Sequence, residues 1–265
     1  MKTEKLQLSD VQNETDNRKI TIDKVGLRGV KVPVTVPVNS CKMVHTTGEL
    51  DLSVELPHRF RGTHMSRIFE EFNKYNDCFW VDEMSDLLKS LQSRLETPNA
   101  FMRLQFPVFI NKEAPVTKAS GPLSYTCALG GSANKKEIDI TLEVSVPVTT
   151  LCPCSKELAD AGAHNQRGMI KAVVRFKKVP LLTDLISMIE NCGSCGIYPV
   201  LKRPDEKYVT EMAYNNPKFV EDVVREVAQH FNEDDNITWF AVEAESQESI
   251  HDHNAYAFVK RDKRN

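Results

Sequence analysis

Residues 137–176, EIDITLEVSVPVTTLCPCSKELADAGAHNQRGMIKAVVRF, decide the fold of this chain. EIDITLEVSVPV (137–148) and GMIKAVVRF (168–176) alternate apolar and polar side chains, and this period of two predicts two β-strands. TLCPCSKELADAGAHNQR (150–167) breaks the alternation and predicts an irregular segment with a short helix. Functional side chains tend to collect in loops held by a rigid sheet. We therefore expect the chemistry of the protein within residues 150–167 and their neighbours in space.

Amphipathic helices and further strands follow this segment. Apolar residues recur at helical spacing in LLTDLISMIE (181–190) and NPKFVEDVVREVAQHF (216–231), and the alternation returns in ITWFAVEAES (237–246) and NAYAFVKR (254–261). Asparagine is a good N-cap residue, so we predict that the longer helix begins at Asn216. This half of the chain is predicted to have the order strand, strand, helix, helix, strand, strand.

The N-terminal half shows the same order of elements. Alternation predicts strands over 20–38, 50–56, 101–110 and 123–131, and helical periodicity predicts helices over 66–75 and 82–96. The predicted fold class is α+β, with two tandem ββααββ units, 18–134 and 135–265, behind a flexible arm over residues 1–17. Such units leave open sheet edges, so we expect oligomerisation to complete barrels.

Composition excludes several classes of protein. The chain has 265 residues and a formal net charge of −3, so no global positive field draws it to nucleic acid or to an anionic membrane. No apolar run approaches the roughly 18 residues of a membrane helix, and the N-terminal stretch is polar where a signal peptide is apolar. Seven cysteines, an odd count, argue against a disulfide scaffold. We expect a cytoplasmic protein that binds neither nucleic acid nor membrane.

Two cysteines and a histidine form the densest group of metal ligands in the sequence. Cys152 and Cys154 lie in Cys-Pro-Cys, ten to twelve residues before His164. Thiolates and imidazole are suitable ligands for zinc or iron. The alternative is that the cysteines pack as small apolar core residues. Polar neighbours, such as Lys156 and Arg167, favour the metal site.

A second pair, Cys192 and Cys195 in Cys-Gly-Ser-Cys, leaves another possibility open. Together with Cys152 and Cys154 it forms a pattern compatible with a four-thiolate structural zinc site, which predicts a zinc-stabilised binding module. Against this, Cys-x-Cys is tighter than the usual zinc knuckle, and such a site leaves His164 unused.

Charged residues at three further places have both a functional and a structural interpretation. Residues 203–207, RPDEK, have the pattern of a solvated loop with weak ion pairs. His251 and His253 lie on the same side of an extended chain, either at the surface or in a site. Glu221, near the start of the long helix, either reaches a crevice or pairs with Arg225.

A basic group lies at the entry to the predicted helix over 66–75. Its members are Arg59, Arg61, His64 and Arg67. Basic side chains beside a helix N-terminus suit a phosphate group, and a solvated surface explains them equally well. Neither a Walker glycine loop nor a Rossmann fingerprint accompanies them, so a conventional nucleotide-binding fold is not predicted.

Four motifs resemble the type IB GTP cyclohydrolase I family. They are PVTTLCPCSKEL (147–158), GAHNQR (162–167), YPVLKRPDEKYVTE (198–211) and NPKFVEDVVREV (216–227), and the resemblance runs from about residue 20 to the C-terminus. It implies the tunnelling fold, in which ββααββ units join into barrels, and a homo-oligomer, usually a tetramer. It also implies metal-dependent hydrolysis of GTP to 7,8-dihydroneopterin triphosphate and formate, a step of folate and pterin, or 7-deazapurine, biosynthesis.

The resemblance also implies site residues. A divalent metal ion, zinc, iron or manganese, is bound by Cys152, His164, Glu206 and His251. Glu221 matches the glutamate that anchors the guanine edge, a task that suits a carboxylate because it accepts two hydrogen bonds.

The implied reaction further needs acid and base groups, and cations for the triphosphate. The candidates for catalysis are Cys152, Cys154, His253 and Glu248. The candidates for the triphosphate are Lys156, Arg61 and Arg67. The alternative enzyme is a related tunnelling-fold member, the NADPH-dependent nitrile reductase of queuosine synthesis, which uses a nucleophilic cysteine and no metal.

Overall fold

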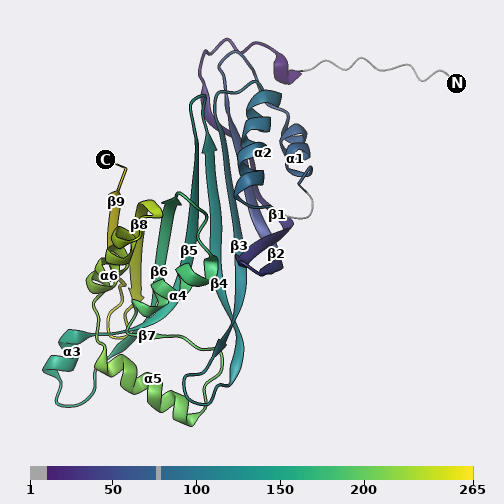
Figure 1. Ribbon diagram of the computed structural model, residues 1–265. Coiled ribbons are helices and arrows are strands. Elements are labelled where there is room, and N and C mark those ends of the chain that lie inside the picture. Colours follow the sequence, from purple (N-terminus) through teal and green to yellow (C-terminus); the bar gives the residue numbers. More distant parts are fainter. Residues whose placement is uncertain (1–10, 76–78, 265) are drawn as a thin grey trace. The chain divides into compact units, whose positions relative to one another are not determined.

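A computed structural model describes residues 11–75 and 79–264 (Figure 1). Its elements in chain order are η1 (Val11–Asn13), β1 (Ile22–Asn39), β2 (Lys42–Leu56), α1 (Met65–Phe72), α2 (Val81–Arg94), β3 (Ala100–Glu113), β4 (Ser120–Ala133), β5 (Ile138–Leu151), α3 (Pro153–Leu158), β6 (Asn165–Phe176), α4 (Leu182–Asn191), β7 (Cys195–Gly196), α5 (Arg203–Asn215), α6 (Val220–Glu233), β8 (Ile237–Gln247) and β9 (Ala255–Asp262). The strands are hydrogen-bonded in the order β1-β2-β3-β4-β5-β6-β8-β9, and β7 pairs with β5. No helix within the described ranges is long and apolar enough to cross a membrane.

The chain divides into two compact units, which we call unit 1 and unit 2. Unit 1 comprises Met1–Val34, Gly48–Leu104 and Gly130–Ile140, and unit 2 comprises Thr35–Thr47, Gln105–Leu129 and Thr141–Asn265. Strands β1 to β5 therefore contribute residues to both units.

Unit 1 has its core around helices α1 and α2. Their buried apolar residues are Ile68, Phe72, Met84, Leu87, Leu88 and Leu91. The carboxylate of Glu71 is buried beside them, where Lys74 and Arg94 form ion pairs with it. The helical spacing of apolar residues on α1 and α2 accounts for this core, and Glu71 is the one charged residue on the buried face.

Unit 2 contains the strands that the opening motif predicted. β5 pairs with β6, β6 with β8 and β8 with β9, all antiparallel. Helix α6 lies alongside β8 and β9 (Figure 1), and it packs there through one apolar face. Phe231 of α6 and Phe240 of β8 contact one another with ring centroids 5.4 Å apart. The core of unit 2 thus forms where a helix of period 3.6 meets strands of period two.

The structure has a strand or helix at each predicted position and differs from the prediction in three places. The two-residue strand β7 lies between α4 and α5, where the sequence predicts no strand. Residues 203–207, predicted as a loop, begin helix α5. The long helix begins at Val220 and not at Asn216. The reason is that Asn216 ends α5, and its side-chain amide donates hydrogen bonds to the carbonyl oxygens of Gly193 (3.1 Å) and Ser194 (3.2 Å).

The predicted arm, residues 1–17, lies mostly outside the described residues. Residues 1–10 are not among the described residues, and Val11–Asn13 form the 3-10 turn η1. The division into tandem units at residue 134 stays a prediction.

Candidate active site

The ends of β5, β6 and β8 bring polar side chains to one face of the sheet. The registers pair Thr150 with Gln166, and Gly168 with Ser246. Since side chains alternate along a strand, Thr150, Gln166 and Ser246 all point to the buried face, and Glu248 follows Ser246 on the same side. The register of three strands therefore gathers residues that lie far apart in the sequence.

Gln166 lies at the centre of the hydrogen-bond network on this face. Its Nε2 donates to Glu248 Oε2 (3.1 Å) and contacts Nδ1 of His164. Its Oε1 accepts from the Thr150 hydroxyl (3.3 Å), which also lies 2.9 Å from Oγ of Ser246. The network fixes the orientation of His164 and Glu248, whose Nδ1 and Oε2 are 3.9 Å apart.

Cys152 and His164 lie opposite one another just beyond the last β5–β6 pair. The Cys152 N–H donates to the His164 carbonyl oxygen (3.2 Å). Cys152 is the N-cap of α3, and its Sγ accepts the N–H of Ser155 at 3.4 Å. The Ser155 hydroxyl oxygen in turn accepts the N–H of His164 (3.2 Å). These bonds hold the two residues side by side, whereas Cys154 in the first turn of α3 is exposed.

A cavity of about 230 Å³ opens at this edge of the sheet. Cys152 and Glu248 line it from the sheet side, and Lys218, Phe219 and Glu221 line it from the start of α6. A hydrogen bond from the Lys218 N–H to the Leu151 carbonyl oxygen (3.1 Å) ties the segment before α6 to β5. A cysteine, two glutamates and a lysine therefore border one cavity.

Glu221 has no hydrogen-bond or ion-pair partner among the described residues. Arg225, its alternative partner, contacts Asp222 instead, with Nη1 and Oδ1 3.4 Å apart. The predicted alternative of a Glu221–Arg225 pair is therefore wrong. The exposed carboxylate of Glu221 is available to a ligand in the cavity.

Of the four predicted metal ligands, Cys152 alone lines the cavity, and His164 lies beside Cys152 without lining it. Glu206 is exposed in the first turn of α5. His251 is exposed between β8 and β9, and its ring stacks on that of His253 with centroids 4.9 Å apart. The structure thus brings Cys152 together with His164, but it does not bring Glu206 or His251 to them.

The predicted triphosphate cations are also distributed over several elements. Lys156 on α3 donates to the Tyr214 carbonyl oxygen of α5 (2.5 Å), and its Nζ lies 4.4 Å from the centroid of the Tyr214 ring. Arg61 and Arg67 belong to unit 1, where Arg61 forms an ion pair with Glu14 (2.5 Å). None of the three lines the cavity of unit 2.

Helix α5 is anchored by a buried carboxylate. Asp205 accepts hydrogen bonds from the N–H groups of Val116 and Thr117 (both 2.9 Å), the Thr117 hydroxyl (2.5 Å) and the Lys202 N–H (3.0 Å). Burial opposes its charge, but these hydrogen bonds outweigh burial and hold the pKa of Asp205 well below its usual range. The β3–β4 turn therefore fixes the first turn of α5, in which Glu206 lies.

The second cysteine pair is part of the core of unit 2. Cys192 ends α4 and Cys195 lies in β7, and both side chains are buried. Burial raises the pKa of Cys192 to about 12 and also raises the pKa of Cys195. Within the described ranges, no four-thiolate group forms with Cys152 and Cys154, so this alternative is wrong there.

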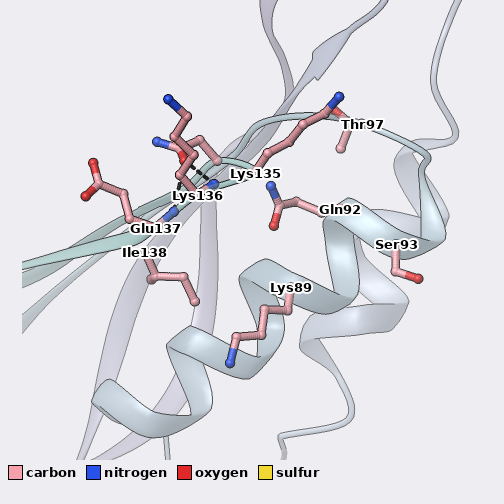
Figure 2. Close-up of a pocket in the computed structure, with 9 residues that line it drawn as sticks. Lys89, Gln92, Ser93, Thr97, Lys135, Lys136, Glu137 and Ile138 are labelled. Atoms are coloured by element: carbon pink, nitrogen blue, oxygen red, sulfur yellow. Dashed lines mark hydrogen bonds between the residues drawn. The ribbon is translucent and has the colours of Figure 1, made fainter.

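Unit 1 has a larger, more open hollow of about 580 Å³ between α2 and the β4–β5 turn (Figure 2). Three lysines border it, Lys89, Lys135 and Lys136. Figure 2 shows that the side chains of Lys89 and Lys135 point away from one another, so their charges do not converge on one ligand. Its lining contains neither cysteine nor histidine. The cavity of unit 2 is therefore the candidate active site.

Known proteins similar to this chain point to one family. The sequence model described as "Type I GTP cyclohydrolase folE2" matches residues 8–257. The chain belongs to the type I GTP cyclohydrolase FolE2 family. It is 46% identical over 255 residues to GTP cyclohydrolase FolE2 of Syntrophobacter fumaroxidans, across 96% of this chain and 99% of the relative. It is 47% identical over 257 residues to the protein of the same name from Geobacter metallireducens, across 97% and 98% of the two chains.

A solved structure resembles this FolE2 family member in fold alone. The uricase from Bacillus fastidious aligns with 91% of this chain and 94% of its own, with a TM-score of 0.57 and 4% sequence identity. This likeness agrees with the predicted α+β class, which the largely antiparallel sheet and its few helices confirm.

Sequence reasoning about this FolE2 family member missed eight of the residues that line the cavity, and four of these join neighbouring elements through hydrogen bonds. These four are Thr150, Gln166, Ser246 and Lys218. The alternation of side chains along a strand could have revealed the first three. Each lies two residues from Cys152, His164 or Glu248, and residues two apart on a strand face the same side. No local signal marks Lys218, which reaches the cavity only because the chain before α6 is tied to β5.

Proposed function

We propose that the chain is a metal-dependent GTP cyclohydrolase that converts GTP to 7,8-dihydroneopterin triphosphate and formate. This reaction begins folate and pterin, or 7-deazapurine, biosynthesis. The observation that carries the proposal is the cavity that Cys152, Glu221 and Glu248 border together. Membership of the type I GTP cyclohydrolase FolE2 family supports the reaction, and the four sequence motifs support the type IB class within it.

The residues at the strand ends fit a divalent metal ion. Cys152 offers a sulfur at the cavity wall, and Nδ1 of His164 contacts Gln166 and lies 3.9 Å from Glu248, so Nε2 is the nitrogen that remains for a metal. At metal sites, the second nitrogen of a ligating histidine is commonly held by a neighbouring polar group. The proposed ligands of zinc, iron or manganese are Cys152, His164, Glu206 and His251, the last two on the sequence motifs alone. When bound, such an ion makes water a nucleophile at neutral pH.

Glu221 is the proposed guanine-binding residue. The N1–H and the 2-amino group of guanine present two donors side by side, and a carboxylate accepts both. Glu221 suits this task because it borders the cavity and has no partner among the described residues. It thereby positions the base with its C8 edge free for attack.

Glu248 is the proposed proton carrier nearest to the cavity. Its Oε2 accepts from Gln166 and its side chain is only 13% exposed, so its position is defined before substrate binds. Cys154 and His253 are further proton-transfer candidates, since both are exposed on segments next to the site residues. The positive charges proposed for the triphosphate are Lys156, Arg61 and Arg67.

The proposed assembly is a homotetramer with the tunnelling fold. Two ββααββ units, residues 18–134 and 135–265, contribute strands to barrels that several chains complete. The antiparallel sheet with helices and the likeness in fold to a uricase support this architecture. Light scattering on the purified chain tests it, with a mass of four chains expected.

Product analysis tests the reaction. Metal-loaded protein is incubated with GTP, and pterin fluorescence and released formate are followed. We expect both products, and neither after a chelator has removed the metal. Oxidation of NADPH in the presence of a nitrile, without metal and without products from GTP, overturns the proposal in favour of the nitrile reductase.

Glu221→Gln tests the recognition of guanine. The amide keeps the shape of the side chain but loses one acceptor and the charge, so kcat/KM for GTP should fall about 100-fold. Glu233→Gln on the same helix is the matched control, because Glu233 accepts a hydrogen bond from Gln229 and does not line the cavity. Equal kcat/KM for the two variants contradicts the assignment of Glu221.

A further inference from the structure

A second group of metal-binding side chains lies in unit 2 and shares no residue with the proposed catalytic site. One ligand atom each of Cys192, Glu226 and His230 lies within 4.8 Å of the other two. Throughout residues 11–75 and 79–264, this is the one group of three such side chains that approach so closely. None of the three lines the candidate active-site cavity.

The sequence builds this group from two helices. Glu226 and His230 are four residues apart on α6, so they project from the same side of the helix in successive turns. Cys192 is the C-cap residue of α4 and is fully buried, with its thiol donating to the Met188 carbonyl oxygen (3.4 Å). A sulfur from the end of one helix therefore meets a carboxylate and an imidazole of another.

A cation already occupies the edge of the group. The ammonium of Lys218 forms an ion pair with the Glu226 carboxylate and donates to the Cys192 carbonyl oxygen (3.2 Å). The lysine side chain is only 13% exposed. The place is thus one at which the protein stabilises positive charge. If another cation took Glu226, Lys218 would keep the carbonyl oxygen as its acceptor.

We propose that Cys192, Glu226 and His230 form a second, structural zinc site. One sulfur, one nitrogen and one carboxylate oxygen are the three kinds of ligand that zinc accepts, and water completes the tetrahedron. Ligand atoms around a tetrahedral zinc lie about 3.5 Å apart, so side-chain shifts of about 1 Å close the group on the ion. On binding, the Cys192 thiol gives its proton to solvent and the thiolate coordinates zinc. The ion then joins the end of α4 to α6.

Zinc stoichiometry of the full chain tests the site. Protein freed of metal is titrated with zinc, and the bound metal is measured per chain. We expect Cys192→Ser to lose one zinc ion per chain relative to the wild type. The matched control is Cys195→Ser, which changes a buried cysteine of the same motif and should bind as much zinc as the wild type.

A surface variant keeps the test decisive if loss of Cys192 disturbs the core. His230→Gln removes a ligand from an exposed position and should weaken the second zinc by at least about 100-fold, while Gln229→Ala beside it should not. Unchanged zinc binding in His230→Gln overturns the site. Cys152→Ala separates this result from the proposed function, because it removes the catalytic ion only and leaves the zinc that depends on His230.

Discussion

Helix α6 passes two clusters that contain the same kinds of side chain but differ in access. Glu221, in its first turn, borders a cavity of about 230 Å³ with the half-buried Cys152. Glu226, further along the helix, lies within 4.8 Å of the fully buried Cys192 and forms an ion pair with Lys218. A thiol and a carboxylate therefore occur together twice, and the first pair borders a cavity.

The difference shows that access and partners, and not residue type, separate the roles of the two clusters. The carboxylate of the first cluster, Glu221, has no partner among the described residues, so it can bind a ligand. The carboxylate of the second, Glu226, is already neutralised by Lys218. The first cluster suits chemistry on a bound molecule, whereas the close ligand atoms of the second suit an ion.

Removal of the first thiol should have the largest effect. A catalytic metal contributes several kcal/mol to the stabilisation of a transition state, so Cys152→Ala should lower kcat for GTP by about 1000-fold or more. Cys195→Ser, in the second cysteine pair, should keep kcat within about threefold of the wild type. Cys195 is buried in the core and does not line the cavity, so its substitution should change the stability of the fold and not the reaction. Formate release by the two variants, with circular dichroism as the check on folding, makes the comparison.

An equal loss of kcat in both variants would break the distinction between the two cysteine pairs. It would mean that the second pair also takes part in turnover.

The rate of thiol alkylation should differ between exposed and buried cysteines, and this difference should be smaller than the effect of Cys152→Ala on kcat. Burial raises the pKa of Cys127 to about 12 from an ordinary value of 9.0, which lowers its thiolate fraction about 1000-fold at pH 8. Burial also raises the pKa of Cys195. In metal-free protein, iodoacetamide should therefore modify the exposed Cys154 at least about 100-fold faster than Cys127 or Cys195. The expected ratio is below about 1000-fold because local opening of the fold exposes the buried thiols from time to time.

Mass spectrometry of peptides after timed alkylation measures these rates. Similar rates at Cys154 and Cys195 would show that the second pair is accessible, contrary to its position in the core.

The sequence was sufficient for the sheet because the period of two is a local property. The stretch 137–148 predicts β5, and alternation around Val242 and Ala244 correctly places Glu243 and Glu245 on the opposite face of β8. Helical periodicity likewise predicts α1, α2 and α4. These elements carry their own signal, so no tertiary information is needed to find them.

Other features depend on contacts that no local pattern reveals. Helix α5 begins where charge alone favoured a solvated loop, because Asp205 is buried by the β3–β4 turn, about 90 residues earlier in the chain. The place of Gln166 between His164 and Glu248 follows from strand register. Register and long-range capping are properties of the fold, and a single sequence does not display them.

Helix α5 contacts helix α3, which follows Cys152, and it also contacts Cys195 of the second cysteine pair, so a change that loosens α5 tests both regions. Lys156 of the Cys-Pro-Cys helix donates to the Tyr214 carbonyl oxygen (2.5 Å), and Sγ of Cys195 lies 3.9 Å from Sδ of Met212. Asp205, at the start of the helix, holds it to the β3–β4 turn.

Asp205→Asn should lower the melting temperature at pH 7. We expect this to be the smallest of the three effects, and the decrease should depend on pH. The pKa of Asp205 is lower in the folded chain than its ordinary value of 3.8, so its charge stabilises the fold above that value, and the contribution is lost as the pH falls toward the folded pKa. The gap in melting temperature between wild type and variant should therefore be largest near pH 7 and narrow below pH 4. Asp235→Asn, an exposed change, should show no gap at any pH. A gap that stays constant from pH 7 to pH 3 would mean that packing, and not the charged hydrogen bonds of Asp205, anchors α5 between the two cysteine pairs.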